Sequence, residues 1–297
     1  MSRSLLLISL LICLLGVTHA ARADQRLVHS ERSLYREVLV YENGDVRCMC
    51  FTRNCRVGRQ SCLDTRHPNR MVMHYPQLML GALYVNPAPR SVLIIGLGGG
   101  TLPRALRQLL PDVRIDVVEI DPAVVRVANR YFDFAASDKT RVIESDGRVY
   151  VKRALRTEQR YDLIMLDAFD HEYIPEHLLT REFLQEVQSL LSPQGVLAAN
   201  TFSSSRLYQH ESATYEAVFG KFFNLKQDNR VIIAQLGPLP DAARLRATAE
   251  QFKGPFRAFG FDATDVLPLF TQARDWDPAA RVLTDQYSPA NLLNLER

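Results

Sequence analysis

The sequence predicts an α/β protein whose main domain has a mostly parallel sheet with helices on both faces, preceded by a small β-rich unit. Three observations predict it. Short apolar runs alternate with helical patterns from residue 91 to about residue 234. The first apolar run leads directly into a glycine cluster. Residues before about 88 instead show strand alternation and a hairpin turn.

The composition permits this architecture. A chain of 297 residues can bury one large core, or a large core and a small domain. Its hydrophobic fraction of 47% and charged fraction of 23% are typical of a globular protein and not of a disordered one. Because the net charge is only +3 and the arginines are scattered, we expect no nucleic-acid partner.

The first 23 residues have the layout of a secretory signal peptide. A short basic start precedes an apolar run from Leu5 to Val17, small residues follow in an A-x-A arrangement, and Asp24 begins a polar sequence. The apolar run is short for a bilayer span. We therefore expect residues 1–23 to be removed and the mature protein to be periplasmic or secreted, without a stable membrane span. The alternative is an uncleaved signal that anchors the protein in a membrane.

The mature chain keeps four clustered cysteines, Cys48, Cys50, Cys55 and Cys62. In an oxidising compartment an even, clustered set predicts disulfides, and three pairings are possible. A zinc site with four thiolate ligands is the alternative. The C-x-C-x4-C-x6-C spacing is not that of a usual zinc site, which favours disulfides.

The small β-rich unit is predicted over residues 24–87. We expect, in order, a strand over 35–41, a hairpin turn over 42–45, a return strand over 46–52 and, after the cysteines, a helix over 71–83. The Asn-Pro-Ala-Pro segment at 86–89 marks the boundary with the main domain, predicted over 88–297.

The main domain is predicted from the alternation of strands and helices. We expect strands over 91–95, 115–119, 141–145, 161–166, 196–200 and 231–234, with helices over 102–110, from 122 onward, over 180–191 and after 200. Asp121 before Pro122 is a good helix start, and Thr180, with Glu182 close behind it, is another.

A nucleoside site is predicted where the first strand of this domain ends. Gly96 and Gly98 follow the strand, a helix begins just after them, and Glu119 ends the next strand. Bare backbone lets a ligand approach, and a carboxylate can accept from both ribose hydroxyls. Because Pro103 stands near where the last glycine of G-x-G-x-x-G would be, an S-adenosyl compound fits better than a dinucleotide. The alternative is a purely structural turn.

Further acids follow the other strands, at the edge where such sheets bind ligands. Asp121 is expected to cap a helix. Asp146, before Gly147, can accept from an adenine amino group. Asp167 and Asp170 follow a buried strand and could hold an amine and take its proton. The alternative for each is a helix cap or an ordinary loop acid.

Taken in order, these motifs resemble those of the spermidine synthase (polyamine aminopropyltransferase) family, with this chain as an exported, divergent member. The matching segments are 92–100, 118–121, 146–147, 161–170 and 179–183, and the resemblance covers most of residues 30–200. It implies a Rossmann-like, class I methyltransferase-type domain after a small N-terminal β domain. It also implies a possible homodimer.

The resemblance implies transfer of an aminopropyl group from decarboxylated S-adenosylmethionine, a co-substrate, to a diamine such as putrescine. No tightly bound cofactor and no metal are implied. By position, the ligand-binding residues would be Gly96 and Gly98 at the turn, Glu119 for the ribose, Asp146 and Gly147 for the adenine, and Asp170, Gln60 and Tyr75 for the substrates. Asp167 would be the base that deprotonates the attacking amine.

Three positions depart from the family pattern. Gly99 stands where the family has an Asp that grips the donor's amine, Arg36 where it has an amide, and Pro76 where it has an acid. A cation at position 36 would repel a diammonium substrate and suit an anionic group, such as the carboxylate of S-adenosylmethionine. Two alternatives follow: an S-adenosylmethionine-dependent methyltransferase, and a non-catalytic exported protein that binds a nucleoside or polyamine.

Overall fold

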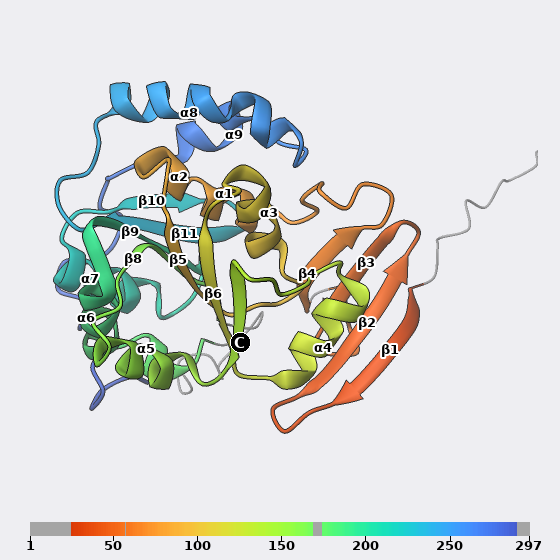
Figure 1. Ribbon diagram of the computed structural model, residues 1–297. Helices are drawn as coiled ribbons and strands as arrows, with labels where there is room; N and C mark the ends of the chain where they lie inside the picture. The colour runs from red at the N-terminus through yellow and green to blue at the C-terminus, as the bar shows by residue number, and fades with distance from the viewer. Residues whose placement is uncertain (1–24, 57, 169–173, 290–297) are drawn as a thin grey trace, which may run out of the picture.

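The computed structural model describes residues 25–56, 58–168 and 174–289 (Figure 1). Within them the chain forms a four-stranded sheet and a seven-stranded sheet, and helices accompany the larger one. The predicted α/β fold with a small N-terminal β unit is confirmed. The predicted signal peptide and Asp170 lie outside the described residues.

The N-terminal sheet is antiparallel, with the strand order β1-β2-β3-β4. Its strands are β1 (Arg26–Arg32), β2 (Glu37–Asn43), β3 (Val46–Cys50) and β4 (Arg59–Asp64). The hairpin predicted between β2 and β3 is present, and Gly44 takes a φ of +59° at its turn. Strands β1 and β4 were not predicted, because β1 is a polar edge strand and β4 follows the cysteine loop.

Two disulfides brace this sheet. Cys48 and Cys62 face one another in the β3–β4 register, with Cα atoms 4.1 Å apart, and they are bonded to each other. Cys50 bonds Cys55 and closes the loop that follows β3. All four side chains are buried in one cluster. The structure thus has one of the three pairings left open above, and disulfides in place of the alternative zinc site.

The main sheet has the strand order β10-β11-β9-β8-β5-β6-β7. Its strands are β5 (Ser91–Ile95), β6 (Arg114–Glu119), β7 (Thr140–Glu144), β8 (Tyr161–Leu166), β9 (Leu191–Phe202), β10 (Phe223–Lys226) and β11 (Asn229–Gln235). Strands β5 to β9 are parallel, and β10 and β11 add an antiparallel edge. The chain order reverses between β5 and β8, and a crevice forms at such a point beyond the strand ends.

Helices cover both faces of this sheet (Figure 1). The helices of the described residues are α1 (Tyr75–Leu80), α2 (Ala82–Val85), α3 (Thr101–Leu109), α4 (Pro122–Tyr131), α5 (Gly147–Leu155), α6 (Arg181–Leu190), α7 (Tyr208–Phe219), α8 (Ala242–Arg257) and α9 (Ala263–Val266), with short 3-10 turns η1 (Glu176–Leu178) and η2 (Leu267–Leu269). The predicted helix caps are confirmed: Asp121 accepts from the Ala123 amide and Thr180 from the Phe183 amide.

The helix predicted over 71–83 is wrong in its extent. Residue 71 instead pairs in a bridge with β4, and the helix begins at Tyr75, where Pro76 suits the first turn. A second helix, α2, follows the break at Gly81. A Cβ at Gly81 would lie 2.8 Å from the Leu78 carbonyl oxygen and 3.2 Å from the Phe270 ring, so the ring packs where a side chain would be.

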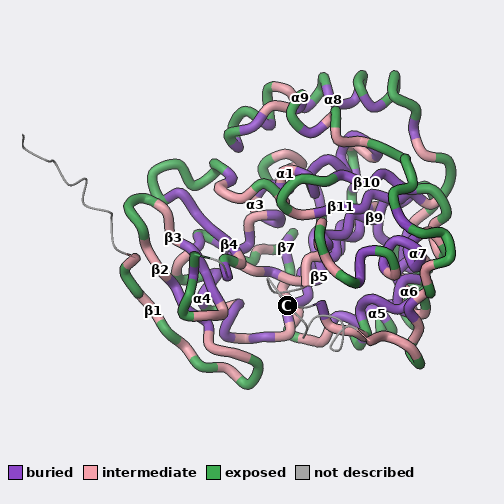
Figure 2. The backbone as a smooth tube through the Cα atoms, turned by 180° about the vertical axis from the view of Figure 1, so that it is seen from behind, coloured by how far each residue is buried: buried purple, intermediate pink, exposed green. Residues whose placement is uncertain are grey.

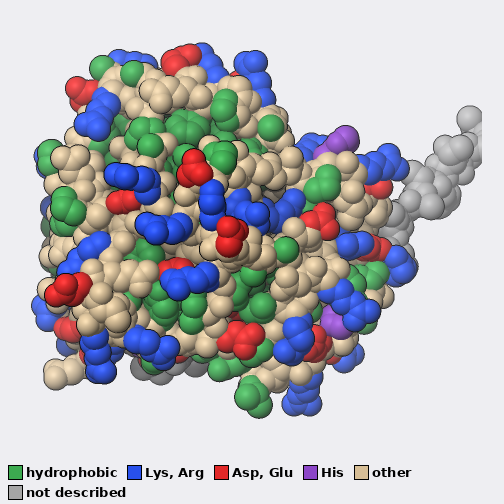
Figure 3. All heavy atoms as spheres, in the orientation of Figure 1, with side chains coloured by type: hydrophobic (Ala, Val, Ile, Leu, Met, Phe, Trp, Pro, Cys, Tyr) green, Lys and Arg blue, Asp and Glu red, His purple; other side chains and the backbone are tan. Residues whose placement is uncertain are grey.

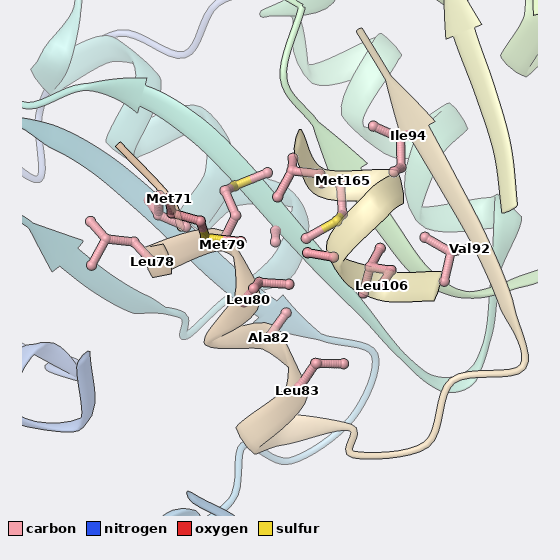
Figure 4. Close-up of a cluster of buried hydrophobic side chains, with 14 of the residues drawn as sticks. Met71, Leu78, Met79, Leu80, Ala82, Leu83, Val92, Ile94, Leu106 and Met165 are labelled. Atoms are coloured by element: carbon pink, nitrogen blue, oxygen red, sulfur yellow. The ribbon is translucent and has the colours of Figure 1, made fainter. Parts of the chain in front are cut away.

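Helices α1 and α2 belong to the core of the main sheet, although they precede the predicted domain boundary. Figure 4 shows Met79 and Leu80 of α1 in one cluster with Ile94 of β5 and Met165 of β8. Figure 2 shows the burial of the described residues: the central strands are buried, and α8 exposes its outer side. The boundary at 87/88 stays a prediction.

On the face shown in Figure 3, acidic side chains lie between the lysines and arginines. Among the residues that the structure describes, no helix is both long enough and apolar enough to cross a membrane.

Loss of either disulfide should destabilise the fold, and the longer loop should matter more. The cross-links close separations of 14 and 5 residues, for which chain entropy predicts losses of about 3 and about 2 kcal/mol respectively. The free energy of unfolding in denaturant, measured in oxidising buffer for the Cys48→Ala/Cys62→Ala and Cys50→Ala/Cys55→Ala variants, checks this. No loss in either variant would contradict the pairing.

Candidate active site

A cavity of about 730 Å³ lies between the N-terminal sheet and the carboxyl ends of the main strands. Every predicted ligand-binding or catalytic residue that the structure describes lines it: Arg36, Gln60, Tyr75, Gly96, Gly98, Glu119, Asp146, Gly147 and Asp167. These residues come from positions 36 to 167 of the sequence. The fold therefore brings the residues predicted to bind the nucleoside and those predicted to bind the amine into one cavity. Asp170 is the one predicted member outside the described residues.

The glycine turn lets two strands approach closely at the floor of the cavity. Gly96 has a φ of +101°, and a Cβ on it would lie 2.3 Å from the Asp167 carbonyl oxygen. The Gly96 amide also donates to the Val118 carbonyl oxygen over 2.8 Å. Only glycine satisfies both the conformation and the spacing. The turn therefore holds the ends of β5, β6 and β8 in contact around the site.

Glu119 presents a buried carboxylate at the end of β6. Its two oxygens accept from the backbone amides of Leu97 and Asp121, each over 3.0 Å. Burial raises its pKa, and the two amide bonds oppose that rise. Each carboxylate oxygen has a second lone pair, so the pair of oxygens can still accept from two hydroxyls. This geometry fits the predicted role toward a ribose.

Asp146 caps a helix, which is one of the interpretations that the sequence left open, and it also lies at the cavity. One oxygen caps α5 by accepting from the Val149 amide over 2.9 Å, and the other lies 2.8 Å from Nε2 of His177. Both Asp146 and His177 line the cavity. His177 was missed because its short segment, η1, follows no predicted strand end and carries no motif. It comes to the site through η1, far along the chain from α5.

Asp167 is the candidate base, at the end of β8. Its Oδ1 accepts from the Asn200 side chain over 2.9 Å, and the Tyr75 hydroxyl also hydrogen-bonds the carboxylate. Loss of solvation raises the pKa of Asp167 to about 7; these two bonds oppose the rise, and the charge of Glu119 adds to it. A carboxylate that titrates near neutrality suits general base catalysis. Asn200 was missed, although it ends the fifth predicted strand at the same edge of the sheet.

The two departures at positions 36 and 99 are built into the packing. The Arg36 guanidinium lies 4.3 Å from the centroid of the Phe51 ring, and its charge opposes the rise that burial causes in the pKa of Glu119. At Gly99, a Cβ would lie 2.7 Å from Oγ of Ser61 and 2.9 Å from the Phe132 ring. An acid could replace Gly99 only if Ser61 and Phe132 moved.

The C-terminal segment 283–289 braces the end of the cavity where Asp146 and Gly147 lie. Asp285 accepts from both Nη atoms of Arg148, over 2.6 and 2.7 Å, and from the Thr180 hydroxyl over 2.7 Å. Arg148 also bonds Glu186 of α6 over 3.0 Å. Because Arg148 directly follows Gly147, this edge contact fixes the first turn of α5 beside the cavity.

Among the residues that the structure describes, no group of three or more His, Cys, Asp or Glu residues is placed so that it could hold a metal ion.

Comparison with known proteins agrees with this geometry. A family model described as the spermine/spermidine synthase domain matches residues 67–232. A polyamine aminopropyltransferase of Vibrio vulnificus is 48% identical over 272 residues, which are 90% of this chain and 91% of the relative. The fold resembles that of a probable spermidine synthase from Corynebacterium glutamicum, with a TM-score of 0.66 at 16% identity over 86% of this chain and 96% of the other.

A solved methyltransferase is also similar. Human methyltransferase-like protein 13 in complex with SAH superposes with a TM-score of 0.55 at 26% identity, over 74% of this chain and 100% of the other.

The Asp167→Asn variant should be more stable than the unchanged protein at pH 8 and similar to it at pH 4. The folded protein holds the Asp167 proton up to about pH 7, whereas the unfolded chain loses it near pH 4. The stabilising contribution of that proton is therefore lost as the pH rises through 7. The difference in the free energy of unfolding between the two proteins at pH 8 is at most about 4 kcal/mol. Solvent that reaches Asp167 through the cavity reduces this difference.

Denaturant unfolding of both proteins at pH 4, 6 and 8 measures this difference. If the two stabilities change with pH in parallel, the environment inferred for Asp167 is wrong.

Proposed function

We propose, from the premise that the chain belongs to the spermine/spermidine synthase family, that it transfers an aminopropyl group from decarboxylated S-adenosylmethionine to a diamine such as putrescine. The chain is a transferase of the polyamine aminopropyltransferase type. The observation that carries the proposal is the Asp167 carboxylate, with a pKa of about 7, in one cavity with the Glu119 carboxylate. The first group can take a proton from an amine, and the second can hold a ribose.

The reaction needs a neutral amine, because an ammonium ion has no lone pair. Asp167 orients the amine and accepts its proton, and the nitrogen lone pair attacks the methylene carbon bonded to the sulfonium. The new N–C bond forms as the C–S bond breaks, and the bonding electron pair stays on sulfur. The leaving group is the neutral thioether methylthioadenosine, so no acid is required. Asn200 and Tyr75 hold the carboxylate in place through their hydrogen bonds.

The donor's adenosine fits the other end of the cavity. Glu119 would accept from the ribose hydroxyls and Asp146 from the adenine amino group, while the bare backbone at Gly96 and Gly98 admits the ligand. His177 beside Asp146 supplies a further polar contact at this end. The braced first turn of α5 keeps Asp146 in position.

A second candidate function is methyl transfer from S-adenosylmethionine. Two observations favour it: the packing around Gly99 leaves no room for an acid that would grip the donor's amine, and Arg36 puts a cation on the cavity wall. The likeness to a methyltransferase solved with SAH supports the same donor. The released thioether separates the two functions, since aminopropyl transfer gives methylthioadenosine and methyl transfer gives S-adenosylhomocysteine.

The Asp167→Asn variant should lose at least about 100-fold in the rate of methylthioadenosine release, because an amide cannot take the amine's proton. The assay uses purified mature protein with putrescine and each donor, and mass spectrometry identifies the thioether. Asp112→Asn, at a fully exposed site, is the matched control.

If S-adenosylhomocysteine is the only thioether released, the proposed aminopropyl transfer is wrong and the protein is a methyltransferase. Binding of methylthioadenosine by calorimetry without any thioether release would instead support the non-catalytic alternative.

We also propose that the protein is exported without residues 1–23. The signal-like layout supports this, and so do the two disulfides, which persist in oxidising compartments. N-terminal sequencing of the protein recovered from its host should begin at Asp24. A chain recovered only inside the cell with Met1 at its start would contradict export. The homodimer stays a prediction.

A further inference from the structure

Two arginines besides Arg36 line the cavity on the side of the N-terminal sheet. Arg56 lies in the loop after Cys55, and Arg59 is the first residue of β4. Both are exposed residues. Within the described part of the chain, neither side chain forms an ion pair or a hydrogen bond, so both guanidinium groups keep their full donor capacity toward a ligand.

The acids of the same cavity do not use these two cations. They are bonded as follows: Glu119 to backbone amides, Asp121 to Ser33 and the Ala123 amide, Asp146 to His177 and the Val149 amide, Asp167 to Asn200 and Tyr75, and Asp228 to His74. None of these bonds goes to Arg56 or Arg59. A cationic wall therefore lies in one cavity with the candidate base.

The disulfides restrict where these arginines can go. The Cys50–Cys55 bond closes the loop directly before Arg56, and the Cys48–Cys62 bond ties β4, which begins at Arg59, to β3. Braced backbone reduces the entropy lost when a side chain is ordered on a ligand.

We propose that Arg56 and Arg59 form a carboxylate-binding subsite of this cavity, beside Arg36. The planar guanidinium fork matches a carboxylate through paired charge-assisted hydrogen bonds. A plain diamine has no group that could use it. The inference rests on the proposed function and changes one of its two substrates: either the donor or the amine acceptor carries a carboxylate.

The two sources lead to different products. If the acceptor carries the carboxylate, the chemistry is that given above, with an amino acid's side-chain amine as nucleophile. If the donor carries it, the donor is S-adenosylmethionine. Attack on the corresponding methylene then breaks the same C–S bond, transfers an aminocarboxypropyl group and still releases methylthioadenosine. Attack on the methyl carbon releases S-adenosylhomocysteine. In each case the amine's proton goes to Asp167.

Matched pairs of small molecules test the subsite, since the members of each pair differ only by a carboxylate. The donor pair is S-adenosylmethionine and its decarboxylated form, compared by calorimetry. The acceptor pairs are ornithine with putrescine and lysine with cadaverine, compared by the rate of thioether release and the product mass. The variant is Arg56→Gln/Arg59→Gln. The control is Arg53→Gln, on the same loop but paired with Glu37 and absent from the cavity wall.

The expected result is a preference of about tenfold or more for the carboxylated member of one pair, lost in the double variant and kept in the control. The pair that shows it identifies the source. Methylthioadenosine has no carboxylate, so its unchanged binding would show that the double variant is folded.

The subsite is overturned if neither member of any pair is preferred. It is also overturned if the double variant keeps the preference for the carboxylated member. If no thioether forms with any combination, the proposed function fails, while the calorimetric comparison of the two donors still decides the subsite.

Discussion

The placement of the Asp167 carboxylate, in contact with neighbouring strands and withdrawn from water, is the constraint on which the rest of the site depends. A carboxylate in such a place is costly unless hydrogen bonds hold it. Asn200 from β9 and Tyr75 from α1 supply those bonds, and Gly96 of the β5 turn makes room for its backbone. Four elements must therefore meet at one point. The cost appears as a pKa of about 7, which is the property that a base for an ammonium substrate needs.

The small N-terminal sheet forms one side of the cavity, and the carboxyl ends of the main strands form the other. Bonds between the two units keep it there: the Ser33 hydroxyl donates to Asp121 over 2.6 Å, and the Arg47 guanidinium donates to the Tyr131 carbonyl oxygen over 2.9 Å. Asp121 thus caps α4 and ties the N-terminal unit to it. The disulfides act within that unit, where a four-stranded sheet alone buries little apolar surface. One wall of the cavity therefore depends on cross-links and the other on core packing.

The cavity has two chemically different halves. The nucleoside half follows the family pattern, with bare glycine backbone, Glu119 and Asp146. The other half has Arg36, Arg56 and Arg59 on its wall, and at Gly99 the Ser61 hydroxyl and the Phe132 ring occupy the space that a side chain would need. Membership of the family therefore accounts for the reaction type, whereas the proposed choice of substrates rests on the charges of this half.

Several parts of the fold and site could be predicted because neighbouring residues determine them. Apolar runs, the Asn-Gly turn, the caps at Asp121 and Thr180, and the strand-glycine-helix unit with Glu119 each depend on local conformation and side-chain period. The carboxyl ends of parallel strands meet at one edge, so the order of the strands already placed Asp146 and Asp167 together. The sequence by itself therefore determined the sheet, its ligand-binding edge and the acids on it.

Tertiary structure decided what depends on contacts between distant segments. It paired Cys48 with Cys62, brought Asn200 and Tyr75 to Asp167, set His177 on Asp146, and connected Asp285 to Arg148. It also divided the helix expected over 71–83 at Gly81, where the ring of Phe270 packs. Such contacts leave no periodic trace in either segment, because each partner has the composition of an ordinary loop or strand end. Only packing in three dimensions, which satisfies buried polar groups and fills space, selects them.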